Sequence, residues 1–157
     1  MVEVKRKDNE SFDFEIKEGE IVVTKQNIRD TPFPYEVYRV DLDGNNLKDF
    51  IVFSSYRMNG FSSWGLRAEI FLKKEEGGYQ HIAYDGAGVG IEDFVDFNKD
   101  GKYEVILTGI YSGQEHTYYS YDIYEFKDYK LVNADSQYKG FPKFIWFTHK
   151  PNDKDTT

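Results

Sequence analysis

The chain of 157 residues lacks cysteine, which excludes disulfide bridges and thiolate metal sites. It also lacks an apolar run long enough to span a membrane, and Met1 leads directly into a charged segment instead of a secretory signal. No stretch is rich in basic residues, and 20 Lys and Arg against 28 Asp and Glu leave a net charge of −8. This balance argues against nucleic-acid backbones and anionic membrane surfaces as partners.

The residue types that would carry catalysis are sparse. There is no cysteine nucleophile, and the three histidines are scattered without metal-ligand spacing. His116 stands beside Glu115 and could form a local acid/base pair, but two solvated loop side chains would give the same pattern. The glycines of 86–90 precede no helical pattern, so they do not indicate a phosphate loop. The sequence therefore predicts a protein that is not an enzyme.

Aromatic residues are abundant, with 13 Tyr and 13 Phe, and this favours strands over helices. Short apolar or alternating segments recur between turn signals, for example the predicted hairpin at 12–23 and the apolar run at 50–53. We expect a single all-β domain over residues 11–150, an antiparallel sheet or sandwich with almost no helix. Residues 1–10 and 151–157 are expected to be a flexible segment and a flexible tail.

The most informative stretch is 96–107. Oxygen-bearing side chains occupy positions 1, 3, 5 and 9 of a loop, and Gly101 at position 6 supplies the positive φ that a sharp turn needs. Calcium prefers six to eight oxygen ligands at about 2.3–2.6 Å, which alternate residues of a coiled loop can supply. The predicted ligands are Asp96, Asn98, Asp100 and Glu104, with the backbone carbonyl of Lys102 at position 7.

The same pattern starts at residue 41, where position 6 is Asn46, a residue type that tolerates left-handed φ. Neither loop has the Glu at position 12 of an EF-hand, and both lead into apolar strands. Two Asx-rich turns that hold no metal remain the alternative. The predicted ligands here are Asp41, Asp43, Asn45 and Asp49, with the carbonyl of Leu47.

The two Asp loops begin 55 residues apart, and the strands around them recur with a similar period. A period near 50 with about four short strands and no helix is typical of a propeller blade. Only about two and a half units fit in the chain, whereas a closed ring needs four or more. We therefore expect blade-like units in an open arrangement, not a closed propeller.

The loops resemble the FG-GAP/VCBS family of β-propeller repeats, whose calcium loop reads D-x-[DN]-x-[DN]-G-x-x-[DE] before an apolar strand. Residues 96–107 match this pattern fully, residues 41–53 match it apart from Asn46, and the resemblance covers roughly residues 35–147. It implies calcium at both loops. It also implies an exported protein (periplasmic, lipoprotein or extracellular) whose signal is removed, although a cytoplasmic location stays open. Small relatives include exported inhibitors of lysozyme-like and other peptidoglycan-cleaving enzymes.

Two connections are candidates for binding a partner. The stretch 54–65 is long and carries residue types enriched at binding hot spots, and 109–117 occupies the same place in the next unit. The tyrosines near 111–124 could add a docking or sugar-stacking surface, or could pack within the sheet. The predicted contact residues are Tyr56, Arg57, Met58, Phe61, Trp64, Glu115 and His116.

The sequence thus predicts a calcium-binding, non-catalytic β module that binds a protein partner. One candidate partner is a cationic cell-wall hydrolase, which would make the protein an inhibitor or immunity factor. An acidic chain would associate faster with such a target through electrostatic steering. The alternative is a carbohydrate-binding or carbohydrate-acting surface protein that uses the aromatic side chains.

Overall fold

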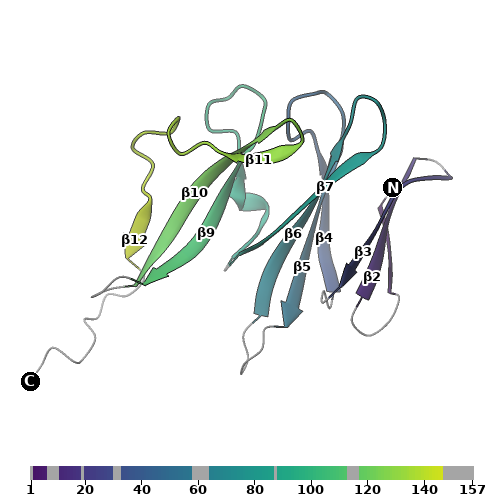
Figure 1. Cartoon of the computed structure of the whole chain (residues 1–157), viewed down its shortest axis with the longest axis horizontal. Coiled ribbons are helices and arrows are strands. Elements are labelled where there is room, and N and C mark those ends of the chain that lie inside the picture. Colours follow the sequence, from purple (N-terminus) through teal and green to yellow (C-terminus); the bar gives the residue numbers. More distant parts are fainter. Residues whose placement is uncertain are drawn as a thin grey trace, which may run out of the picture.

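The computed structural model describes residues 2–6, 11–18, 20–29, 33–57, 64–86, 88–112 and 117–146. This part of the chain is all-β, as the sequence predicts, and its only helical element is the 3₁₀ turn η1 (Ile91–Asp93). The strands form three separate antiparallel sheets that follow one another in chain order. Figure 1 shows them side by side in an open row, so within the described part there is no closed propeller.

The first and middle sheets are simple meanders, because each strand pairs with its sequence neighbour. The first sheet has the order β1-β2-β3, and the middle sheet has the order β4-β5-β6-β7. The strands of the first sheet are β1 (Val2–Arg6), β2 (Ser11–Glu18) and β3 (Ile21–Arg29). Those of the middle sheet are β4 (Phe33–Val40), β5 (Asp49–Arg57), β6 (Trp64–Lys73) and β7 (Tyr79–Gly86).

The third sheet has five strands. Four of them follow the order β11-β10-β9-β8, and the fifth, β12, pairs with the first half of β10 on the same side as β11. Its central strand β10 pairs with β9 from Thr117 opposite Ser112 to Glu125 opposite Glu104. The strands are β8 (Phe94–Val95), β9 (Glu104–Ser112), β10 (Thr117–Lys127), β11 (Lys130–Asn133) and β12 (Phe144–Trp146).

The main hydrophobic core lies between the middle and third sheets. One face of β5 and β6 contributes residues such as Phe53 and Ile70, and Phe94, Val105 and Phe126 of the third sheet pack in the same core. Phe53 packs edge-on against Phe94, with ring centroids 6.1 Å apart. Burial of these apolar groups is the main force holding the two sheets together.

The middle sheet is buried on its other face as well. Phe50, Val52 and Phe71 are at most 6% exposed although they point away from the main core. The first sheet flanks the middle sheet on this side, opposite the third sheet (Figure 1). All four residues of the apolar run at 50–53 are therefore buried, so β5 is covered on both faces there.

Three segments differ from the sequence-based expectation. Val2–Arg6, expected to be flexible, is strand β1 and pairs with β2. The connections expected at 54–65 and 109–117 are shorter, because β5 continues to Arg57, β6 begins at Trp64 and β9 continues to Ser112. Polar residues in these places satisfy their backbone groups through ladder pairing with neighbouring strands, so polarity alone did not reveal the strand ends. The predicted tail at 151–157 lies outside the described residues.

Candidate metal site at the Asp loops

The first Asp loop joins β4 to β5 and gathers three carboxylates. One oxygen from each of Asp41, Asp43 and Asp49 lies within 4.8 Å of the other two. Asp49 is fully buried, whereas Asp41 and Asp43 are partly exposed. Like charges at this separation repel one another, and a bound cation or proton would relieve the repulsion.

Asp49 ties the loop to the middle sheet. Its Oδ2 accepts a hydrogen bond from the Leu42 N–H at 2.7 Å, and its Oδ1 accepts one from the Lys73 N–H at 2.7 Å. Burial raises the pKa of Asp49 to about 6, the two backbone donors oppose that rise, and the charges of Asp43 and Asp41 add to it. This carboxylate therefore connects the start of β5, the loop and the end of β6.

The turn itself is held by Asp41. Its Oδ1 accepts from the Gly44 N–H at 2.9 Å and its Oδ2 accepts from the Asn46 N–H at 2.8 Å. Gly44 and Asn46 have φ of +73° and +63°, so positions 4 and 6 both adopt the left-handed conformation. The expectation that Asn46 would tolerate this conformation is confirmed.

Asn45 adds an oxygen that faces the loop backbone. Its Oδ1 accepts from the Leu47 N–H at 2.8 Å, while its Nδ2 donates to Asp43 Oδ2 at 3.2 Å and to the Lys73 carbonyl at 3.0 Å. Of the predicted ligands of the first loop, Asp41, Asp43 and Asp49 thus lie together, and Asn45 contacts Asp43. Carboxylate, amide and carbonyl oxygens are the donors that Ca²⁺ and Mg²⁺ accept, so the residues fit a hard divalent cation.

The second Asp loop, between β8 and β9, repeats this hydrogen-bond plan. Asp96 accepts from the Gly101 N–H at 3.0 Å, and the buried Glu104 accepts from the Phe97 N–H at 3.0 Å, just as Asp49 accepts from Leu42. Lys99 and Gly101 have φ of +61° and +86° at positions 4 and 6. In the described residues only the first loop brings three acidic side chains within metal-binding reach of one another.

In the second loop, the remaining predicted ligands also serve the turn. Asn98 Oδ1 accepts from the Asp100 N–H at 2.9 Å, and Asn98 Nδ2 donates to Asp100 Oδ2 at 3.0 Å. Asp100 Oδ1 accepts a hydrogen bond from the Lys102 N–H at 2.9 Å, which holds the backbone at Lys102, the residue whose carbonyl is a predicted ligand. The loop is therefore a well-ordered Asx-rich turn whose acidic groups are more widely spaced than those of the first.

The two Asp loops touch each other. They lie at the same end of their sheets, at the top of Figure 1, and the Tyr103 N–H donates to the Leu42 carbonyl at 2.8 Å. Tyr103 also packs against the main core, in which Leu42 is fully buried. Sequence reasoning predicted each loop but not their contact, because residues about 60 positions apart in the chain meet only when the sheets stack.

The predicted partner-binding residues are only partly placed. Tyr56 and Arg57 end β5, Trp64 begins β6, and Arg57 lies opposite Trp64 in the ladder, so these three share one end of the middle sheet. Their side chains lie outside the described part. So do four further residues of the prediction, which are Met58, Phe61, Glu115 and His116.

The structure instead exposes apolar side chains at the end of the third sheet, which sequence reasoning did not single out as a set. Four of them, Ile110, Tyr111, Phe144 and Ile145, are between 45% and 56% exposed. Both Ile110 and Ile145 lie opposite Tyr119 in the ladder, on either side of it. The rings of Tyr111 and Phe144 are 5.5 Å apart. Consecutive residues of a strand point to opposite faces of a sheet, so Ile110 and Ile145 lie on one face and Tyr111 and Phe144 on the other. We call Ile110 and Ile145 the terminal apolar patch.

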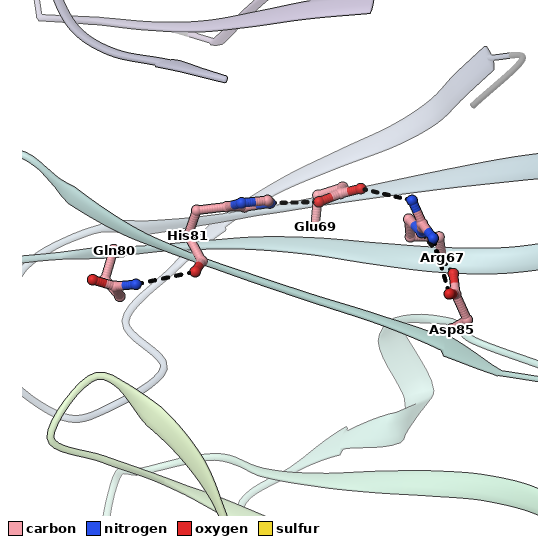
Figure 2. A network of polar contacts seen from close by, with 5 residues as sticks. All are labelled: Arg67, Glu69, Gln80, His81 and Asp85. Atoms are coloured by element: carbon pink, nitrogen blue, oxygen red, sulfur yellow. Dashed lines mark hydrogen bonds and ion pairs between the residues drawn. The ribbon is translucent and has the colours of Figure 1, made fainter. Parts of the chain in front are cut away.

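A polar network around one buried glutamate of the middle sheet was also missed by sequence reasoning (Figure 2). Glu69 is 1% exposed, and its Oε2 lies 2.5 Å from His81 Nε2. Its Oε1 lies 4.0 Å from an Arg67 nitrogen, and Arg67 forms a bidentate pair with Asp85 at 2.6 and 2.9 Å. Alternation alone assigns Glu69 to a strand face, and only the stacking of sheets buries that face.

Among the residues that the structure describes, no helix has the length and apolar character needed to cross a membrane. Comparison of the chain with protein-family models, with curated proteins and with solved structures gave no match. The resemblance of the Asp loops to FG-GAP/VCBS repeats therefore stays a prediction from the motifs, and the function has to be argued from the geometry.

Proposed function

We propose that this chain is a calcium-binding, non-catalytic β module. The observation that carries the proposal is the meeting of Asp41, Asp43 and Asp49 within 4.8 Å in a loop whose other oxygens suit a hard cation. The net charge of −8 means that the chain has fewer basic than acidic side chains with which to neutralise these carboxylates. A cation bound here would be linked to folding, because the loop geometry does not exist in the unfolded chain.

The role of the ion in this proposal is structural. Asp49 already joins β5, the loop and the end of β6 through two 2.7 Å hydrogen bonds, and the first loop contacts the second through Leu42 and Tyr103. A cation would neutralise the repulsion among the three carboxylates and fix the end of the middle sheet against the third. The affinity should be moderate, because two of the three carboxylates remain partly exposed to water.

The test is a thermal melt with added calcium chloride and with excess chelator. At a calcium concentration about 100 times the dissociation constant, binding adds about 2.7 kcal/mol. For a domain of this size that corresponds to a rise in the melting midpoint of about 5–10 °C. The variants Asp41→Ala/Asp43→Ala and Asp96→Ala/Asp100→Ala are matched, since each removes two carboxylates from one loop.

We expect the first variant to lose most of the calcium response and the second to keep most of it. If calcium and chelator give superimposable melts for the wild type, the proposal fails and both loops are simply Asx-rich turns. If only the second variant loses the response, the site is at residues 96–104, as the motif match predicts, and not where the carboxylates gather.

We further propose that the module binds a protein partner through the terminal apolar patch. Ile110 and Ile145 are each about half exposed and lie on one face of the sheet on either side of Tyr119, and exposed apolar groups that cluster often mark interaction sites. A cationic cell-wall hydrolase is the partner class that suits an acidic module, which would act as its inhibitor after export.

The partner proposal can be tested with a lysozyme-type hydrolase by titration calorimetry at low and high salt. A salt-sensitive complex that Ile110→Ser/Ile145→Ser weakens would support it. Binding of chito-oligosaccharides in place of the enzyme would favour the carbohydrate alternative, because Tyr111 and Phe144 offer ring faces for sugar stacking. Binding of neither probe would remove the support for both.

A further inference from the structure

The backbone at Lys102 and Tyr103, in the second Asp loop, is held against the first. The Tyr103 N–H donates to the Leu42 carbonyl at 2.8 Å, and the Lys102 N–H donates to Asp100 Oδ1 at 2.9 Å. Leu42 stands between Asp41 and Asp43, which belong to the carboxylate cluster. The base of the Lys102 side chain is thereby positioned next to the first loop.

The Lys102 side chain then crosses Gly44. A Cβ atom built on Gly44 would lie 2.9 Å from Lys102 Cγ and 3.4 Å from Lys102 Cε. The apolar stem of the lysine therefore occupies the space that a side chain at position 44 would fill. Position 44 therefore favours glycine for two reasons, its φ of +73° and the space taken by the lysine stem. The lysine side chain in turn extends along the first loop.

The positive charge of Lys102 acts on the cluster without a direct pair. In the described part of the chain Lys102 makes no ion pair within 4.0 Å. Burial raises the pKa of Asp43 and the charge of Asp41 raises it further, whereas two backbone hydrogen bonds and the charge of Lys102 oppose the rise. Lys102 is the basic side chain that the geometry brings to these carboxylates.

We propose that Lys102 is the intramolecular counter-ion of the first Asp loop, and that a divalent cation bound at that loop competes with it. The inference deepens the proposed function, and the competition between Lys102 and a bound cation rests on that function. The lysine screens the carboxylates when the loop holds no metal, and it lowers cation affinity because two positive charges cannot share one small site at no cost. The second loop thereby sets the cation affinity of the first.

The experiment compares Lys102→Gln with Lys99→Gln, each alone and combined with Asp43→Ala. Lys99 is an exposed lysine of the same loop at position 4, so both variants remove one positive charge from the second loop. Calcium chloride is the only probe, and its dissociation constant is measured by titration calorimetry. Melting midpoints are also measured in chelator, at about 0.01 M salt and at about 1 M salt, where the screening length falls from about 30 to 3 Å.

We expect Lys102→Gln to tighten calcium binding about two- to fivefold relative to Lys99→Gln, as suits a partly screened charge pair. This gain should shrink by at least half in the Asp43→Ala background. In chelator at low salt, Lys102→Gln should melt at a lower temperature than Lys99→Gln, and high salt should abolish that difference.

The inference is overturned if the two lysine variants bind calcium with the same affinity, or if the gain persists in full without Asp43. If no variant and no wild-type sample binds calcium, the proposed calcium site fails, and the melts in chelator decide on Lys102 alone. A salt-sensitive loss confined to Lys102→Gln then supports its role as counter-ion, and equal midpoints refute that role.

Discussion

Replacing His81 by Leu should destabilise the protein, because it would leave the buried Glu69 carboxyl group without its hydrogen bond to His81 and with only the Arg67 guanidinium, 4.0 Å from its Oε1, nearby. Glu69 is 1% exposed, its Oε1 makes no hydrogen bond in the described part of the chain, and His81 Nε2 is the group that lies against its Oε2. Leu is chosen over Ala because it retains apolar contact with Phe71, on which the His81 ring stacks at 4.9 Å.

The magnitude follows from the burial of the pair. Removing the hydrogen-bonded partner of a buried carboxyl group costs about 3–5 kcal/mol when nothing else compensates that group. The His81 side chain is 25% exposed, so water can reach the vacated side, and Arg67 stays 4.0 Å from Glu69 Oε1, so the lower end of that range, about 3 kcal/mol, applies. For a domain of this size that loss lowers the melting midpoint by about 6–12 °C.

The assay is urea and thermal denaturation in chelator, so that metal binding does not enter. Glu69→Leu/His81→Leu should recover most of the loss, because two apolar groups on this buried face replace the pair without leaving a charge. Gln80→Leu is the matched control: Gln80 neighbours His81 in β7, and its Nε2 donates to the His81 carbonyl at 3.2 Å and not to Glu69, so the cost of this change should be within about 0.5 kcal/mol.

Two outcomes would refute this reasoning. A loss below about 1 kcal/mol for His81→Leu would mean that Arg67 or water satisfies the Glu69 carboxyl group without the histidine. A double variant as unstable as His81→Leu would mean that the histidine acts through packing and not through the carboxylate.

Three further predictions concern the loops and the core. In chelator, the urea midpoint should fall as pH rises from about 4 to about 6, since the folded Asp49 carboxyl, with its pKa raised from 3.8 to about 6, holds a proton that the unfolded chain has released. Asp49→Ala should flatten this dependence, and a midpoint that rises over the same interval would contradict it. Gly44→Ala should lower the melting midpoint more than Gly77→Ala, because both glycines have left-handed φ but only the former meets another side chain, that of Lys102. Phe53→Ala should cost about 3–5 kcal/mol in urea denaturation, because its fully buried ring fills the core between the middle and third sheets.

The sequence predicted the parts of the structure that depend on local patterns. Alternating apolar residues and the wealth of Tyr and Phe indicated an all-β chain, and the small number of repeat units, about two and a half, indicated an open arrangement. The hydrogen-bond plan of the Asp loops is also local: Asp41 and Asp96 bind amides within five residues of themselves, and Asn46 and Gly101 take up left-handed φ where the motif requires it.

Strand ends and the relative merit of the two loops were harder to predict. Ser54 belongs to a strand because its backbone pairs with Arg67, a contact that side-chain polarity does not encode. The second loop matches the calcium motif better, yet the three carboxylates of the first loop lie closer together. In the first loop, Asp49 is held by an amide of β6 as well as by an amide of its own loop.

The sequence by itself determined the strands, the turns and the candidate ligands, because each depends on residues that are close together in the chain. Only the tertiary structure decided which groups share a site. Stacking of the sheets carries Lys102 onto Gly44, and it buries Glu69 against His81. These contacts join residues of different loops or strands, and their energies depend on burial and on the neighbouring charges, which exist only after the sheets have packed.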